Sequence, residues 1–210
     1  MISEIEGYAE PNKSAVLVID MQNDFCHPQG HFGKRNLNLL PVHEMIPSLK
    51  RFVDAARNLG VTIVHVRSFM DEKLLPPSMI ARNKALGREK GICLAGSWGA
   101  EFYQILPAGN DMILTKHTYS AFVNTDLQGK LLEKGIQSLM VTGVMTNVCC
   151  ESTLRHGFML GFYTFLVEDC CSSLDEGAHL ATVEYVRKYF GWVLEWNDVI
   201  TYWTRGNSGL

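Results

Sequence analysis

Hydrophobic residues in this chain form short unbroken runs that alternate with stretches of helical spacing. The unbroken runs predict strands buried on both faces, as in a parallel sheet; they cover residues 15–20, 61–66, 112–115, 138–144, 162–168 and 192–196. Apolar residues three or four positions apart predict helices at 43–59, 124–134, 149–160 and 174–189. Strands that alternate with helices predict an α/β fold, with a parallel sheet covered by helices on both faces.

Polar residues next to these helices indicate where two of them begin. Asn124 or Thr125 is expected to cap one helix, and Ser172 or Ser173 to open another.

Residues 68–110 break the alternation of strands and helices, since they are rich in proline, glycine and charge and predict only a short helix around 98–106. Long loops in compact α/β domains often cover a binding site, and we predict that role here. No linker is evident, so we predict one domain over residues 1–210.

Composition excludes several classes of protein. The chain is 47% hydrophobic, and its 19 basic and 22 acidic residues form no long run of one sign, which argues against disorder and against nucleic-acid binding. The longest apolar stretches, of about six residues, are too short to span a membrane, and the N-terminus does not resemble a signal peptide. Four of the six cysteines form two adjacent pairs, a poor disulfide framework. We therefore predict a cytoplasmic protein with free thiols.

Three chemically reactive residues follow predicted strands. Asp20 ends the first, Lys116 ends the third, and Cys149 follows the fourth at the start of a helix. Because binding sites in parallel sheets gather at the carboxyl ends of the strands, these residues are candidates for one site. A helix N-terminus and a nearby ammonium would lower the pKa of the Cys149 thiol, and Asp20 would act as general base and then as acid.

Each of the three residues also has a plain structural explanation. Taken alone, Cys149 would be a buried thiol, Asp20 a turn-capping acid, and Lys116 a solvated surface cation. Their joint placement favours a nucleophilic site.

Three segments resemble the isochorismatase-like cysteine hydrolases, which include nicotinamidases, N-carbamoylsarcosine amidohydrolase, biuret hydrolase and ureidoacrylate amidohydrolase. The segments are AVLVIDMQNDFCHPQG, TKHTYSAFVNTDL and VTGVMTNVCCESTLRHGF, and the resemblance runs from about residue 13 to 196. It implies a three-layer α/β/α sandwich around a six-stranded, mostly parallel sheet. It places the family's catalytic aspartate at Asp20, its lysine at Lys116 and its nucleophile at Cys149, while Cys150 serves packing.

The resemblance also implies a backbone arrangement and a reaction. A non-proline cis peptide would join Val144 to Met145, and the backbone N–H groups of Met145 and Cys149 would form an oxyanion hole. The implied chemistry is acyl transfer from a small amide or ureido substrate through a thioester. The alternatives are vinyl-ether hydrolysis and a non-catalytic binding role. Cys149 argues against the first, because members that cleave a vinyl ether tend to lack the cysteine, and the intact set of Asp20, Lys116 and Cys149 argues against the second.

No metal or other cofactor is expected. Nicotinamidases carry an Asp-x-His segment after the second strand, whereas this chain has HVRSFMDEK there. His65 lies within the predicted strand and Asp71 lacks a histidine partner at that spacing. We therefore interpret His65 as a histidine of the core rather than a metal ligand.

The sequence says less about the substrate and the oligomeric state. The segments TNVCCESTLRHGF, GSWGAEF and YFGWV resemble the ureidoacrylate amidohydrolase branch, although they can equally reflect packing of the nucleophile helix. Candidate substrate-binding residues are Phe25, Arg67, Trp98, Tyr119 and Asn147. Arg67 would bind a substrate carboxylate or be solvated.

Relatives commonly form dimers or tetramers, so we expect a homo-oligomer. The aromatic residues Trp196, Tyr202 and Trp203 would join the interface or anchor the C-terminal segment to its own subunit.

Overall fold

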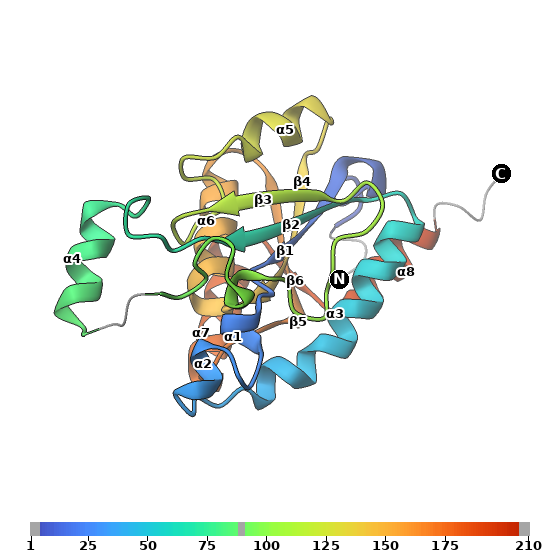
Figure 1. Cartoon of the computed structure of the whole chain (residues 1–210). Coiled ribbons are helices and arrows are strands. Elements are labelled where there is room, and N and C mark those ends of the chain that lie inside the picture. Colours follow the sequence, from blue (N-terminus) through green and yellow to red (C-terminus); the bar gives the residue numbers. More distant parts are fainter. Residues whose placement is uncertain (1–4, 88–90, 206–210) are drawn as a thin grey trace.

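Six parallel strands form the central sheet of the computed structural model, which describes residues 5–87 and 91–205 (Figure 1). The strands are β1 (Ser14–Ile19), β2 (Thr62–Ser68), β3 (Met112–Lys116), β4 (Ser138–Val144), β5 (Tyr163–Ser172) and β6 (Trp192–Leu194), in the order β3-β2-β1-β4-β5-β6. Every neighbouring pair is parallel. The predicted six-stranded sheet is therefore confirmed, and it is fully rather than mostly parallel.

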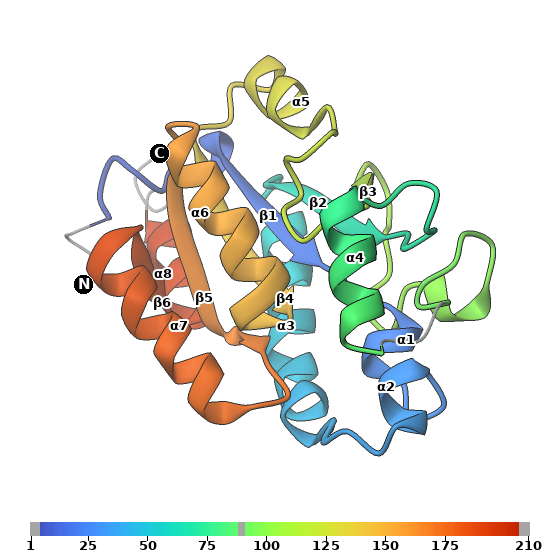
Figure 2. The ribbon, with the colours of Figure 1, turned by 90° about the vertical axis from the view of Figure 1, so that its left-hand side faces the viewer.

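Helices cover both faces of this sheet. Helices α3 (Leu40–Asn58) and α8 (Trp196–Arg205) pack on one face, and α5 (Leu127–Glu133), α6 (Glu151–Met159) and α7 (Glu176–Tyr189) on the other. Figure 2 shows α6 and α7 in front of the sheet and α3 behind it. Alternate residues of β1 contribute to the two cores, Val16 and Val18 to one and Leu17 and Ile19 to the other. This arrangement confirms the predicted three-layer sandwich.

Several predicted boundaries are wrong for local reasons. Helix α5 begins at Leu127, after Asp126, and Thr125 Oγ1 accepts the Leu127 N–H at 3.4 Å. Strand β5 continues through Ser172, so α7 begins later than predicted. Its cap is Asp175, which accepts the Ala178 N–H at 2.6 Å. Strand β6 ends at Leu194, because Trp196 already opens helix α8.

The C-terminal aromatic residues anchor α8 to its own chain. Trp203 is 2% exposed, stacks on Phe52 at 5.8 Å and donates to the Ala9 carbonyl at 2.7 Å. Tyr202 donates to Glu10 at 2.7 Å, and Trp196 packs against the core. Of the two interpretations of these side chains, the structure therefore supports attachment within the subunit.

The region between β2 and β3 contains more structure than its sequence predicted. Helix α4 (Pro77–Ala85) projects from the body of the molecule and contains no buried residue (Figure 1). Only a three-residue 3₁₀ turn, η3 (Trp98–Ala100), stands where a helix around 98–106 was predicted. Short turns of helix also occur at η2 (Pro11–Lys13), α1 (Asn23–Cys26) and α2 (His31–Lys34). Across the described part of the chain, no helix combines the length and apolar character needed to cross a membrane.

Candidate active site

Asp20 follows β1 with its backbone in the left-handed region, at φ +53°. Its N–H donates to the Val66 carbonyl of β2 at 2.8 Å, and its side chain is 1% exposed. Aspartate tolerates this conformation better than most residues, because its short polar side chain can form local hydrogen bonds. The turn directs the Asp20 carboxylate into the protein.

Lys116 is the last residue of β3, and its ammonium is fully buried. Its Nζ lies 2.7 Å from Asp20 Oδ2 and 3.0 Å from the Thr118 carbonyl oxygen. Burial by itself lowers the pKa of Lys116, but the negative charge of Asp20 and the hydrogen bond to its carboxylate outweigh burial and raise the pKa above its ordinary value. The side chain therefore remains an ammonium.

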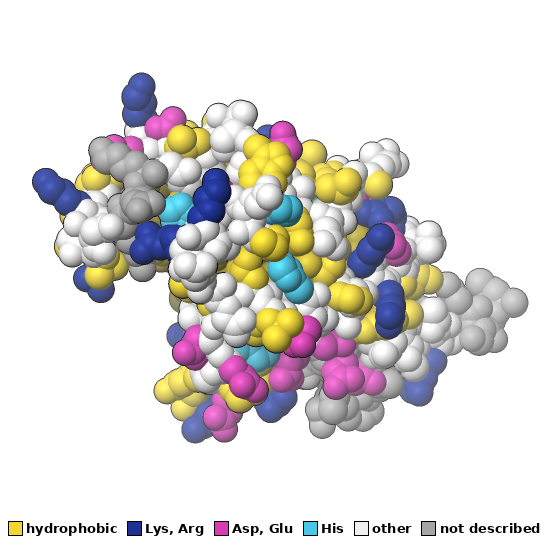
Figure 3. All heavy atoms as spheres, turned by 60° about the horizontal axis from the view of Figure 1, so that its bottom comes forward, with side chains coloured by type: hydrophobic (Ala, Val, Ile, Leu, Met, Phe, Trp, Pro, Cys, Tyr) yellow, Lys and Arg dark blue, Asp and Glu magenta, His cyan; other side chains and the backbone are white. Residues whose placement is uncertain are grey.

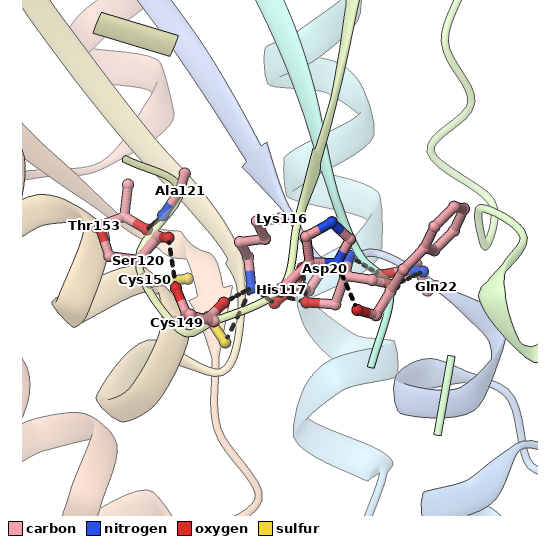
Figure 4. A network of polar contacts seen from close by, with 12 residues as sticks. Asp20, Gln22, Lys116, His117, Ser120, Ala121, Cys149, Cys150 and Thr153 are labelled. Carbon is pink, nitrogen blue, oxygen red and sulfur yellow. Dashed lines mark hydrogen bonds and ion pairs between the residues drawn. The ribbon is translucent and has the colours of Figure 1, made fainter. Parts of the chain in front are cut away.

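Cys149 lies in a π-helical turn, η4 (Thr146–Cys150), that leads directly into α6. Its sulfur lies 3.5 Å from Lys116 Nζ, and Figure 4 shows Lys116 between Asp20 and Cys149. All six cysteines are free thiols; Cys149 is partly exposed, whereas the other five are buried. The structure thus brings together the three residues that the sequence marked as reactive.

The protonation of Cys149 differs from the prediction. Burial raises the pKa of its thiol. The Asp20 charge, and the hydrogen bond that its carboxylate accepts from the thiol, raise this pKa further, whereas Lys116 lowers it. The net direction is upward, because removal from water and the nearby carboxylate together exceed the effect of the ammonium. The resting group is therefore a thiol, and the lowered pKa that the sequence predicted is wrong in direction.

Backbone geometry lets the Cys149 turn approach Asp20. Gly143, in β4, has φ +104°, and a Cβ there would lie 2.1 Å from the Ile19 carbonyl oxygen, so a side chain has no room. The peptide bond between Val144 and Met145 is cis. The Met145 carbonyl accepts the N–H groups of Val148 at 3.1 Å and Cys150 at 3.2 Å.

A second set of contacts joins the loop after β3 to the helix after Cys149. Ala121 N–H donates to Thr153 Oγ1 at 3.0 Å, a contact visible in Figure 4. Ser120 Oγ and His156 Nδ1 lie 3.0 Å apart. Because both bonds connect this loop to α6, they fix Lys116 relative to Cys149.

Sequence reasoning missed two polar residues of the site. Ser68 Oγ donates to Asp20 Oδ1 at 3.0 Å and accepts from Lys116 Nζ at 2.7 Å. Gln22 accepts the Ser68 N–H at 2.7 Å and donates to the carbonyls of Ser68 at 3.0 Å and Ala100 at 2.9 Å. Ser68 could have been found from its position, because it ends β2 at the same edge of the sheet as Asp20 and Lys116.

Part of the predicted cover is bound to the turn after β1. Asn23 donates to the carbonyls of Glu101 at 2.9 Å, through its backbone, and Trp98 at 2.8 Å, through its side chain. Asp24 accepts the Cys93 N–H at 2.6 Å. The segment 93–101 is therefore held beside the residues that follow Asp20.

Four of the candidate substrate-binding residues lie on elements around the site. Phe25 is half-buried on α1, Tyr119 is half-buried after β3, and Trp98 is 45% exposed on η3. Asn147, in the π turn, accepts the Ser173 hydroxyl at 2.8 Å. The Trp98 ring meets the His27 ring edge-on at 4.9 Å. Histidine and hydrophobic side chains lie together on the face of the molecule that Figure 3 shows.

Arg67 points away from the Cys149 side of the sheet. It precedes Ser68 in β2, and successive strand residues point to opposite faces. Its Nε donates to Thr115 Oγ1 at 3.0 Å and its guanidinium lies 4.5 Å from the centre of the Phe69 ring. There it lines a pocket of about 120 Å³ with Phe69 and Ser97. Ala100 of η3 also lines this pocket, so Arg67 points away from Cys149 but lies on the same side as the Trp98 turn.

His65 is buried in the core beside Asp111. Its Nε2 lies 3.1 Å from Asp111 Oδ2, which also accepts from Arg57 at 2.7 Å. Burial lowers the pKa of His65, which favours the neutral ring. Within the described ranges, no three histidine, cysteine or acidic side chains are grouped to hold a metal ion.

The chain is similar to known proteins in fold, over most of its own length and of theirs. Residues 14–198 match the model of the isochorismatase domain. A cysteine hydrolase from Pseudomonas syringae pv. phaseolicola 1448A is similar in structure (TM-score 0.82, 24% identity, covering 94% of this chain and 95% of that one). An isochorismatase-like hydrolase from Alkaliphilus metalliredigens has a TM-score of 0.75 at 26% identity, covering 95% and 99%. N-carbamoylsarcosine amidase from Thermoplasma acidophilum has a TM-score of 0.71 at 23% identity, covering 88% and 97%.

Proposed function

Because the chain belongs to the isochorismatase family, we propose that it is a cysteine-dependent amidohydrolase acting on a small amide or ureido compound. The observation that carries this proposal is the contact of Lys116 with both Asp20 and Cys149, at 2.7 Å and 3.5 Å. A thiol beside a carboxylate and an ammonium has the groups needed for covalent acyl transfer. The amidase among the structural neighbours agrees with this chemistry.

The first half of the reaction forms a thioester. The Asp20 carboxylate takes the thiol proton, and the Cys149 sulfur attacks the substrate carbonyl carbon. Lys116 stabilises the negative charge on sulfur while the proton lies on Asp20. The backbone N–H groups of Met145 and Cys149 donate to the oxygen of the tetrahedral intermediate. Asp20 then returns the proton to the departing nitrogen, and the C–N bond breaks.

The second half regenerates the enzyme. Asp20 takes a proton from a water molecule, whose oxygen attacks the thioester carbonyl. The C–S bond breaks, and the sulfur recovers its proton from Asp20. The products are an amine or ammonia and a carboxylic or carbamic acid, so no oxidant or other co-reactant is consumed.

Phe25, Trp98, Tyr119 and Asn147 are the substrate-binding residues that we propose. Arg67, whose pocket adjoins η3, is a fifth candidate and would bind a substrate carboxylate there. The favoured substrates are ureido compounds of the ureidoacrylate and N-carbamoylsarcosine type. We also propose that the chain acts as one domain, in a homo-oligomer, and in the cytoplasm; the six free thiols agree with a reducing compartment.

Ammonia release from ureidoacrylate, N-carbamoylsarcosine, biuret and nicotinamide tests the proposal. We expect turnover of at least one ureido compound, and loss of nearly all of it in Cys149→Ser, whose folding is checked by circular dichroism. Alkylation by iodoacetamide should modify Cys149 before the buried Cys26 and Cys93 and should abolish turnover. Full activity after modification of Cys149 would exclude it as the nucleophile.

A further inference from the structure

Ser68 connects the two charged residues of the site. Its hydroxyl donates to Asp20 Oδ1 at 3.0 Å and accepts from Lys116 at 2.7 Å, while Lys116 also donates to Asp20 Oδ2 at 2.7 Å. These bonds form a closed ring of three side chains, all buried. The proposed reaction assigns no role to Ser68.

The number of protons on Lys116 limits what it can do for Cys149. An ammonium has three protons. Four acceptors surround Nζ: Asp20 Oδ2 at 2.7 Å, Ser68 Oγ at 2.7 Å, the Thr118 carbonyl at 3.0 Å and Cys149 Sγ at 3.5 Å. The three oxygens are closer than the sulfur and are better acceptors. The sulfur therefore competes with three oxygens for these protons and accepts the longest of the four hydrogen bonds.

We infer that Ser68 is a positioning residue, whose hydroxyl occupies one Lys116 proton and fixes the Asp20 carboxylate, so that Cys149 remains a thiol until Asp20 takes its proton. This inference rests on the proposed function. In the reaction the proton moves from Cys149 to Asp20, and Lys116 keeps its three protons throughout.

The surroundings of Ser68 hold its hydroxyl in place. Gln22 bonds both the N–H and the carbonyl of Ser68. Thr118 also carries a hydroxyl near the ammonium, but its Oγ1 donates to the Ser120 carbonyl at 3.2 Å. Titratable groups that act on Cys149 come from three elements: Asp20 after β1, Lys116 in β3 and Cys150 in η4. Ser68 contacts the first two.

Removing the hydroxyl should shift the thiol titration. In Ser68→Ala one Lys116 proton loses its acceptor, and the sulfur at 3.5 Å is the remaining neighbour. The hydrogen bond from Lys116 to the thiolate becomes stronger, so the alkylation profile should move down by about one pH unit, which makes alkylation about tenfold faster at a given pH below the midpoint. Asp20 also loses the donor to Oδ1. The misplaced base should lower kcat about tenfold or more, with KM within about twofold.

The decisive experiment measures the rate of Cys149 alkylation by iodoacetamide between about pH 6 and pH 10, with modified peptides assigned by mass spectrometry. Wild type, Ser68→Ala and Ser68→Thr are compared. Threonine keeps a hydroxyl and should retain the wild-type profile. Ser14→Ala is the matched control, because Ser14 is buried at the opposite end of the sheet, in β1, and its hydroxyl donates to the Glu10 carbonyl at 2.8 Å.

The outcomes separate this inference from the proposed function. A downward shift in Ser68→Ala that Ser68→Thr does not show supports the positioning role. Superimposed wild-type and Ser68→Ala profiles, or equal shifts in both variants, overturn it. If Ser68→Ala does not fold, Ser68→Val is compared with Ser68→Thr, which has nearly the same volume. Alkylation needs no substrate. A wild type without amidase activity would therefore refute the proposed function, while the alkylation profiles of the variants would still test the role of Ser68.

Discussion

The Lys116 ammonium and the Asp20 carboxylate form an ion pair 2.7 Å long, although 96 residues separate them in the chain. Neither group reaches water, so each charge depends on the other for compensation. A buried ion pair of this kind is expensive to break, because removing one partner leaves the other charge desolvated and alone. Stability and reactivity of this site therefore depend on the same contact.

Lys116→Met tests this dependence. The substitution leaves Asp20 as an uncompensated buried charge, so we expect the free energy of unfolding to fall by about 3–5 kcal/mol, together with loss of turnover. Urea unfolding at about pH 7 measures the first effect, and ammonia release the second. The control is Lys130→Met on the surface of α5, where the Lys130 ion pair with Asp126 is exposed to solvent. A similar urea midpoint for both variants would contradict the prediction.

Gln22 is expected to matter for both folding and catalysis. Its amide makes three buried hydrogen bonds, two to Ser68 and one to Ala100. Gln22→Ala leaves those backbone groups unsatisfied and should lower the free energy of unfolding by about 2–4 kcal/mol. Because Ser68 then loses its support, kcat should fall more than KM changes. Gln29→Ala, at an exposed position after α1, is the control; equal unfolding midpoints for the two variants would show that Gln22 is dispensable.

Buried thiols should make the fold sensitive to alkaline pH. Burial raises the pKa of Cys26, Cys93, Cys150 and Cys170. Above about pH 8.5 the unfolded chain releases these protons while the folded chain keeps them, so the free energy of unfolding falls as pH rises. Each thiol contributes at most about 1.4 kcal/mol per pH unit.

Urea unfolding in the presence of a reductant, at several values between about pH 7 and pH 10, measures this slope. The stabilisation should be complete below about pH 8.5 and decrease above it. Cys26→Ala removes one titrating thiol and should flatten the slope. A free energy of unfolding that stays constant or increases toward pH 10 would contradict the assignment.

Replacement of two tryptophans by alanine should affect different properties, stability in one case and substrate binding in the other. Trp203 is 2% exposed and packed on Phe52, so Trp203→Ala should lower the free energy of unfolding by about 3–5 kcal/mol. Trp98 is 45% exposed, so Trp98→Ala should leave the melting temperature nearly unchanged and raise KM for the ureido substrate. An unchanged KM in a folded Trp98→Ala variant would remove Trp98 from the proposed substrate pocket.

The amino-acid sequence by itself determined the layers of this protein and three members of its site. Unbroken apolar runs such as residues 15–20 predict strands buried on both faces, because only a parallel sheet between helices removes both faces from water. Asp20, Lys116 and Cys149 were identifiable because each follows such a run, at the edge where strand ends meet.

Only the tertiary structure decided how these groups act on one another. The end of β2 marks Ser68 as lying at the site, but the sequence does not show which groups Ser68 and Gln22 bond, since their bonds to Asp20 and Ala100 span 48 and 78 residues. Arg67 and Ser68 are neighbours in the chain, yet strand geometry sends them to opposite faces. The protonation of Cys149 depends on burial and the Asp20 charge, which raise its pKa, balanced against the Lys116 charge, which lowers it. These desolvation and Coulomb energies are set by distances that exist only after folding.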